Sequence, residues 1–207
     1  VYGVLQSVTS PEGNTEAYSY NSLNRPTERR RIAKSGSGLA TIIETAAYTC
    51  NVDICRSRMT QRVDGNGNTT DWEYSTVHAG LLKETLPPDA NGVRPETRYT
   101  YQQKYAWLKS GSNYVQALTP IWLLVSEEYC RTSSADANGN CSAGASDEVV
   151  TTYQYEAGNA SRGSNLHLLG MAVTADGQTL RTCYGYDDKG RRIFETQPNA
   201  NLSTCQS

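Results

Sequence analysis

The strongest constraint on this 207-residue chain is a recurring three-residue motif: an aromatic residue, any residue, and then tyrosine. The five clear copies are Tyr18-Ser19-Tyr20, Trp72-Glu73-Tyr74, Tyr99-Thr100-Tyr101, Tyr153-Gln154-Tyr155 and Tyr184-Gly185-Tyr186. Two weaker copies, Tyr48-Thr49-Cys50 and Glu128-Tyr129-Cys130, fit between them, so that successive copies lie 24–31 residues apart. A recurring spacing of this size indicates a repeat architecture in which each copy belongs to one supersecondary unit.

Turn sequences stand in front of four of the clear copies, and a short run of alternating apolar residues precedes each turn. The turns are Pro11–Asn14, Asp64–Asn68, Asp89–Gly92 and Asp176–Gly177. Asp, Asn and Gly tolerate the positive φ that tight hairpin turns require. We therefore predict β-hairpins in which both tyrosines of a copy lie on one face of a sheet, because strand side chains alternate between faces.

The predicted fold is all-β, built from antiparallel β-hairpin repeats side by side, because an isolated hairpin is only marginally stable. Tyrosines of stacked copies would form ladders across strands, with roughly 0.2–1 kcal/mol for each aromatic pair. No sustained apolar stripe at helical spacing is present. The 14 Tyr, against 1 Phe, favour a sheet with two partly wet faces over one dense core, because tyrosine joins an apolar ring to a polar tip.

The last copy carries a resemblance to a known family. Residues 184–191, Tyr-Gly-Tyr-Asp-Asp-Lys-Gly-Arg, resemble the YD repeat of the RHS family, whose usual form is Tyr-x-Tyr-Asp-x-x-Gly-Arg-Leu, and Asp187, Gly190 and Arg191 match it directly. Residues 18–25 are similar, with Asn at the Asp and Gly positions. The resemblance covers most of the chain, residues 1–104 and 148–202.

The resemblance implies an architecture and a set of partners. YD repeats of this family form β-hairpins that wind into a hollow shell in bacterial Rhs toxins, in shell components of insecticidal toxin complexes and in teneurins. In the toxins the shell encloses a C-terminal toxic polypeptide. A section of such a shell would be a curved, spiralling sheet, and its partners would be the rest of a larger parent chain and an enclosed polypeptide. Val1 is not an initiator Met, which also leads us to expect a longer parent.

Three segments are expected. Residues 1–104 and 148–207 carry the YD-type hairpin repeats. Residues 105–147 break the repeat, and we predict either an irregular insertion or a long pair of strands with a disulfide-closed loop. All three would belong to one continuous sheet, whose exposed edges would let the chain self-associate.

The six cysteines pair naturally as sequence neighbours, Cys50 with Cys55, Cys130 with Cys141 and Cys183 with Cys205. Fifteen connectivities are available to six cysteines, and free thiols or a metal site are the alternatives. The metal alternative is weak, because the chain has no C-x-x-C and only two histidines, His78 and His167. Disulfides would place the protein outside the cytosol, secreted or at the cell surface.

Charge argues against several partners. The formal net charge is −2, which gives no reason to expect binding to nucleic acid or to an anionic membrane. A local basic run is interpreted as a solvated strand face; it comprises Arg25, Arg29, Arg30, Arg31 and Lys34. No run of 18 apolar residues occurs, so no transmembrane helix is predicted.

Catalytic constellations are also missing from the sequence. No G-x-S-x-G motif occurs, and no spacing selects a pair of carboxylates for glycoside hydrolysis. The runs that begin at Asp64 and Asp136 imitate the start of a calcium loop but lack its Gly and Glu, so turns are the better interpretation. We therefore predict no enzyme, no catalytic residue, no metal and no cofactor.

Two functions follow from these expectations. The first is a non-catalytic structural module of an exported RHS/YD-repeat protein, forming part of a β-shell that encloses or displays a toxin or other polypeptide. The alternative is a cell-surface carbohydrate-binding or adhesive repeat module that binds glycans through exposed aromatic rings, for which Trp72, Trp107 and Trp122 are the candidates.

Overall fold

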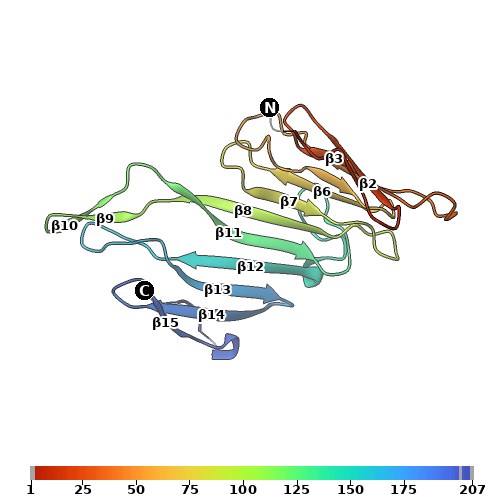
Figure 1. Cartoon of the computed structure of the whole chain (residues 1–207). Coiled ribbons are helices and arrows are strands. Elements are labelled where there is room, and N and C mark those ends of the chain that lie inside the picture. The colour runs from red at the N-terminus through yellow and green to blue at the C-terminus, as the bar shows by residue number, and fades with distance from the viewer. Residues whose placement is uncertain (1–2, 201, 206–207) are drawn as a thin grey trace. The chain divides into compact units, whose positions relative to one another are not determined.

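A computed structural model describes residues 3–200 and 202–205 of the chain, so the outermost residues of the predicted terminal segments lie outside it. The described residues form strands, turns and two short 3-10 helices, Ala145–Asp147 and Pro198–Ala200, and the fold is all-β as predicted. Among them, no helix has the length and apolar character needed to span a bilayer. The chain divides into two compact units, the first ending at Arg94 and the second beginning at Pro95 (Figure 1).

The N-terminal unit is an antiparallel meander in which each strand pairs with the next strand along the chain (Figure 1). Its seven strands are β1 (Ser7–Thr9), β2 (Thr15–Tyr20), β3 (Pro26–Ile32), β4 (Ile42–Ala47), β5 (Gln61–Val63), β6 (Thr69–Tyr74) and β7 (Leu81–Thr85). Short connections between consecutive strands favour this arrangement, because they leave each strand closest to its sequence neighbour.

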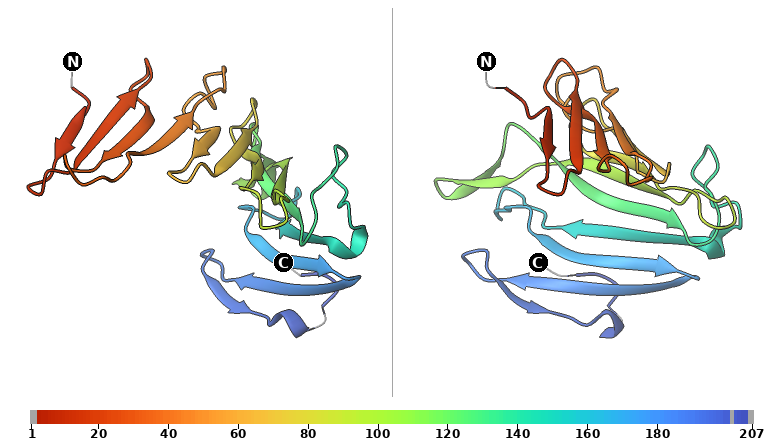
Figure 2. Two further views of the ribbon diagram at one scale, coloured as in Figure 1. Left: turned by 90° about the vertical axis from the view of Figure 1, so that its right-hand side faces the viewer. Right: turned by 45° about the vertical axis from the view of Figure 1, so that its right-hand side comes forward.

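The strands of the C-terminal unit are also antiparallel and pair in the order β8-β11-β12-β13-β14-β15, and they lie side by side in Figure 2 (green to blue). Between β8 and β11 the chain makes a separate hairpin of two strands, β9 and β10. The bounds are β8 (Glu96–Lys104), β9 (Trp107–Ser110), β10 (Asn113–Gln116), β11 (Ile121–Cys130), β12 (Glu148–Tyr155), β13 (Leu168–Ala175), β14 (Gln178–Tyr186) and β15 (Arg192–Glu195).

The central segment, residues 105–147, lies entirely in the C-terminal unit. It supplies the β9–β10 hairpin and then β11, a ten-residue strand that pairs with β8 on one side and β12 on the other. A loop closed by the Cys130–Cys141 disulfide follows. The segment thus contributes a central strand to the sheet.

Tight turns form where the sequence indicates them. Asp176 and Gly177 connect β13 to β14 with φ values of 53° and 70°. Positive φ at both central residues is the signature of a type I′ turn, whose twist matches that of the flanking strands. A Gly accepts this conformation without strain and Asp is one of the few other residues that tolerates it.

The buried core is small and consists largely of cystine. Among the described residues, nine apolar side chains are buried, and five of them belong to cysteines. The one cluster of buried side chains in contact joins Leu169, Cys183 and Cys205 in the C-terminal unit. This pattern matches the expectation of a sheet with two partly wet faces, since most strand residues are neither fully buried nor fully exposed.

The predicted tyrosine ladders do not run between directly paired strands. In the C-terminal unit the motif strands β8, β12 and β14 are separated by β11 and β13, and in the N-terminal unit three strands lie between β2 and β6. Each motif aromatic therefore faces a residue of another kind on the adjacent strand: Tyr18 faces Arg29, Trp72 faces Glu84 and Tyr99 faces Glu127. In a meander, the second strand of each hairpin lies between successive motif strands. Motifs that recur along the sequence are therefore not neighbours in the sheet.

Candidate functional site

All five clear motif copies lie on strands, namely β2, β6, β8, β12 and β14. In four of them the strand ends at the last tyrosine of the motif, which is Tyr20, Tyr74, Tyr155 or Tyr186. The motif therefore marks a fixed position within its hairpin, just before the chain leaves the strand.

A β-bulge lies beside the last tyrosine of every clear copy. The register shifts between the middle residue and the last tyrosine, so that one residue of the following paired strand has no partner. The unpartnered residues are Thr27, Leu82, Val125, Leu169 and Ile193. A bulge bends its strand and increases the local twist. The motif thus recurs together with a bend in the sheet, which no pattern in the sequence indicates.

The last tyrosine also fastens its strand to the preceding part of the sheet. The hydroxyls of Tyr20, Tyr155 and Tyr186 donate to the carbonyl oxygens of Leu5, Leu124 and Leu168, each at 2.8 Å. Leu124 and Leu168 lie on the strands that precede β12 and β14. The same contact in three copies explains why the motif ends in Tyr, because Phe has no hydroxyl to donate.

We expect Tyr186→Phe to lower the free energy of unfolding by about 1 kcal/mol, because the ring stays packed while one part-buried hydrogen bond is lost. Tyr155→Phe should behave alike, since its hydroxyl makes the equivalent bond. Urea denaturation followed by circular dichroism measures the change. Tyr129→Phe is the matched control, because the Tyr129 ring is 41% exposed on β11. An equal loss in the control would contradict the fastening role.

The first aromatic of several copies meets a carboxylate. The Tyr18 hydroxyl donates to Glu16 at 2.5 Å, and the Trp72 indole N–H donates to Glu84 at 2.8 Å. The Tyr18 hydrogen bond, and after it the Arg29 guanidinium, hold the pKa of Glu16 below its ordinary value. Burial, and then the charge of Glu127, raise the pKa of Tyr153 to about 12. The hydroxyls of Tyr18 and Tyr153 therefore stay protonated at neutral pH and can donate hydrogen bonds.

Five loops share one geometry, which the structure forms at residues 21–25, 64–68, 89–93, 136–140 and 187–191. In each loop, the backbone N–H of the first residue donates to the carbonyl oxygen of the fifth, and the N–H of the fourth residue donates to the carbonyl oxygen of the first. The side-chain oxygen of the first residue accepts the third and fifth N–H groups. The fourth residue has positive φ, as at Asn24 (56°) and Gly190 (74°). Asn21 and Asn24 thus do in their loop what Asp187 and Gly190 do in theirs.

The shared loop geometry supports the turn interpretation of the runs at Asp64 and Asp136. One carboxylate oxygen of each accepts two backbone N–H groups, at 2.8 and 3.0 Å for Asp64 and at 2.8 and 2.9 Å for Asp136. The second oxygen accepts the amide of Asn68 or Asn140. Both carboxylates are thus committed to their own loops.

The loop geometry predicts a pH dependence at Asp187. Hydrogen bonds from the backbone of Arg191, and then its guanidinium, hold the pKa of Asp187 below its ordinary value. A lowered folded pKa gives stability that is fully present above about pH 4 and is lost as the pH falls through the folded pKa. Asp187→Asn keeps the acceptor at every pH, as Asn21 does, and should lose less stability on acidification than the wild type.

Thermal unfolding from pH 6 to pH 2 measures this difference. Asp188→Asn is the matched control, because it removes the same charge from the next residue without touching the loop bonds. Equal acid sensitivity of the two Asn variants would contradict the role assigned to Asp187.

The three disulfides of the structure are Cys50–Cys55, Cys130–Cys141 and Cys183–Cys205, which are the predicted pairs. Their Cα–Cα distances are 5.8, 5.5 and 5.3 Å, within the usual range for a disulfide. The first two close short loops, and the third fixes the C-terminal segment to β14. All six cysteines of the sequence are accounted for in this way.

One group of residues has the composition of a metal site but not its chemistry. Cys130, Cys141 and Asp147 gather their sulfur and oxygen atoms within 4.8 Å. The two sulfurs are joined in a disulfide, and both Asp147 oxygens accept hydrogen bonds from the backbone and hydroxyls of Thr132 and Ser133. The cluster instead stabilises the loop after β11.

The three arginines of the basic run that lie on β3, Arg29, Arg30 and Arg31, are paired with carboxylates. Arg29 contacts Glu16 at 2.5 Å and Glu44 at 3.8 Å, and Arg31 contacts Glu44 at 2.5 Å. The two arginine side chains remain 40% and 43% exposed. Carboxylates of neighbouring strands thus balance these charges, in agreement with a solvated strand face rather than an anion-binding patch.

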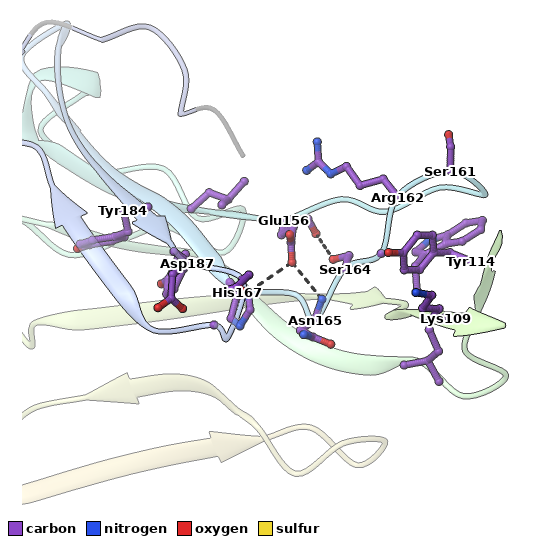
Figure 3. Close-up of a pocket in the computed structure, with 18 of the residues that line it drawn as sticks. Lys109, Tyr114, Glu156, Ser161, Arg162, Ser164, Asn165, His167, Tyr184 and Asp187 are labelled. Carbon is purple, nitrogen blue, oxygen red and sulfur yellow. Dashed lines mark hydrogen bonds and ion pairs between the residues drawn. The ribbon is translucent and has the colours of Figure 1, made fainter. Parts of the chain in front are cut away.

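A cavity of about 640 Å³ lies in the C-terminal unit (Figure 3). Its walls come from the β9–β10 hairpin, from the loop between β12 and β13, and from the end of β14 with the turn that follows. The motif residues Tyr184, Tyr186, Asp187 and Gly190 line it, together with Trp107. The repeat thus supplies one wall, and segments outside the repeat supply the others.

The polar centre of the cavity is Glu156. Its carboxylate accepts the backbone N–H of Asn165 at 3.0 Å and lies 3.5 Å from Nδ1 of His167 (Figure 3). The His167 ring stacks on Tyr186 with 4.6 Å between ring centroids. The Ser164 hydroxyl donates to the Glu156 carbonyl oxygen and accepts the N–H of Leu166, so both of its roles are local.

Sequence patterns placed some of these residues and missed others. Trp107 is the one predicted glycan-binding tryptophan in this cavity; Trp72 lines a smaller pocket of the N-terminal unit, and Trp122 lies on β11 with 37% exposure. Glu156, Asn165 and His167 follow no motif, and the sequence offered no reason to group them.

Comparison with known proteins found no protein-family model that matches the chain and no curated protein similar to it.

Proposed function

We propose that the chain is a non-catalytic structural module of an exported RHS/YD-repeat protein and forms part of a β-shell that encloses or displays another polypeptide. The observation that carries the proposal is the bulge that accompanies all five clear copies of the tyrosine motif. A bend repeated at a regular position along a meander curves the sheet in successive steps, which is how sheets are shaped to wrap around a volume.

Three other features support a structural role. The tyrosine hydroxyl bonds of three motif copies and the five equivalent loops between consecutive strands hold the hairpins together rather than opening a reaction site. The carboxylates of Asp64, Asp136 and Asp187 are committed to these loops. The three disulfides support export, because structural disulfides persist in oxidising compartments.

The edges of the sheets provide the proposed attachment to further repeats. All four residues of β15 are exposed, as are all three of β1, and each strand pairs on one side only among the described residues. Unpaired strand edges accept another strand. We expect the isolated chain to self-associate with rising concentration, which multi-angle light scattering measures. A monomer at all concentrations would contradict this proposed attachment.

Mass spectrometry of the exported parent protein tests the proposed function. The parent is purified natively and its mass is compared before and after denaturation. We expect a second polypeptide that stays bound until the shell unfolds. An uncleaved parent that holds no second polypeptide would exclude the enclosing role and leave display at the cell surface. Turnover that is lost on changing a single carboxylate would contradict the non-catalytic proposal itself.

A further inference from the structure

The cavity of the C-terminal unit is built by a hairpin that has no place in the main sheet. β9 and β10 pair only with each other among the described strands. Backbone hydrogen bonds tie this hairpin to the loop after β12: Trp107 and Ser164 exchange N–H···O bonds at 2.9 and 3.1 Å, and the Tyr114 N–H donates to Ala160 at 3.0 Å. The hairpin thus closes one wall of the cavity.

Three aromatic rings of the wall are seated against glycines. A Cβ at Gly158 would lie 2.5 Å from the Trp107 ring, and a Cβ at Gly163 would lie 2.6 Å from the Tyr114 ring. A Cβ at Gly190 would lie 2.9 Å from the His167 ring. A glycine behind each ring allows close packing on the backbone and limits the positions that the ring can take. The wall therefore presents rings held in place rather than mobile side chains.

The rings line the length of the cavity. In the view of Figure 3, Tyr184 and Tyr114 lie toward opposite ends, with Glu156 and His167 between them. Rings offer flat apolar faces, and the indole N–H and tyrosine hydroxyls add polar edges. A ligand for this wall carries both apolar and hydroxyl-bearing surface.

Charge in the cavity is balanced. Glu156 and Asp188 supply negative charge and Lys109 and Arg162 positive charge, whereas Asp187 is already paired with its own loop arginine at 2.7 Å. A strongly charged ligand would meet like charges as well as opposite ones. Carboxylates accept hydrogen bonds and the basic groups donate them, so a neutral ligand whose hydroxyls both donate and accept suits the whole set.

We propose that this cavity is a binding site for a neutral saccharide. Sugar rings stack on the Trp107 and Tyr114 faces, and sugar hydroxyls bond the Asn165 side chain and the Glu156 carboxylate. The volume of about 640 Å³ falls within the range of small-molecule sites. The site goes beyond the shell role and is independent of it, because a shell section needs no ligand cavity outside its hairpins.

Isothermal titration calorimetry of the whole chain tests the site. The probes are neutral oligosaccharides of glucose, galactose and N-acetylglucosamine, with sulfated and sialylated glycans and chitosan as charged comparisons. We expect saturable binding of at least one neutral oligosaccharide. Trp107→Ala should weaken that binding by about tenfold or more, because the stacking surface is lost. Trp122→Ala is the matched control and should leave binding unchanged.

Asn165→Ala separates binding from folding. Its backbone bond to Glu156 does not involve the side chain, so the loop is kept while the proposed sugar contact is lost. We expect an unchanged melting temperature and a several-fold weaker affinity. Binding of no neutral saccharide, binding unaffected by both the Trp107 and Asn165 changes, or tighter binding of the charged glycans would each overturn the proposal. None of these outcomes bears on the mass measurement that tests the shell.

Discussion

Replacing Cys183 and Cys205 together by alanine lowers the free energy of unfolding by about 3 kcal/mol in our expectation. The two residues are 22 apart in sequence, so their bond removes considerable freedom from the unfolded chain. Both are buried, at 4% and 6% exposure, against Leu169. In a protein whose core consists largely of cystine, few other contacts can compensate for this loss. Urea denaturation of the oxidised protein and of the double variant measures the difference.

The Cys50–Cys55 bond provides the comparison within the same chain. Its residues are 5 apart in sequence, and the same entropy argument gives about 2 kcal/mol for its removal. The ordering of the two double-alanine variants is therefore the sharper test. A larger loss from the Cys50–Cys55 variant would show that loop closure is not what makes the Cys183–Cys205 bond matter.

Gly170→Ala should destabilise the C-terminal unit by about 1–3 kcal/mol. Gly170 lies on β13, and a Cβ there would overlap the Cys205 sulfur and lie 2.9 Å from the Thr182 carbonyl oxygen. Neither neighbour yields easily, because one belongs to a disulfide and the other to the backbone of the adjacent strand. Thermal unfolding followed by circular dichroism measures the loss.

Two other glycines separate crowding from the general effect of adding a methyl group. A Cβ added at Gly3 would have no neighbouring heavy atom within 4 Å, so Gly3→Ala should leave the free energy of unfolding nearly unchanged. Gly185→Ala meets the Phe194 ring, which is 54% exposed and can rotate away, so its cost should be smaller than that of Gly170→Ala. Equal losses at Gly170 and Gly185 would contradict the argument from rigid neighbours.

The disulfide and the glycine should also be coupled. In the background in which Cys183 and Cys205 are alanine, the sulfur no longer faces Gly170, and a new Cβ is opposed only by the Thr182 carbonyl oxygen and, at 3.3 Å, the Cβ of residue 205. The cost of Gly170→Ala should therefore shrink in that background, a non-additivity expected of residues in contact. If the cost of Gly170→Ala were the same with and without the disulfide, contact with the Cys205 sulfur would not be its cause.

Features that depend on neighbouring residues follow from the sequence. The Asp176–Gly177 turn forms because both residues accept positive φ, and each disulfide joins cysteines no more than 22 residues apart. The motif tyrosines lie on strands because alternation and turn residues are local properties of the chain. The same reasoning placed Tyr184, Tyr186 and Asp187 in one hairpin, although it gave no reason to expect a cavity beside them.

Features that depend on pairing were not accessible in this way. Tyrosines of successive copies do not face each other on adjacent strands, because the strand order of a meander, not the repeat period, decides which residues are paired. The bulges opposite the last tyrosines arise from the register of two strands, and a one-residue shift in register leaves no mark on composition or alternation.

The sequence alone therefore determined that the chain is all-β and where its hairpins turn, since both depend on residues close together along the chain. It favoured the pairing of neighbouring cysteines but left the other connectivities open, and the structure selected the three pairs. Only the tertiary structure decided the bends of the sheet and the cavity around Glu156. Trp107, His167 and Tyr186 come from separate segments and meet through backbone pairing and through contacts that glycines permit. No pattern within one segment records such a meeting, because its physical cause lies in the packing of segments distant in sequence.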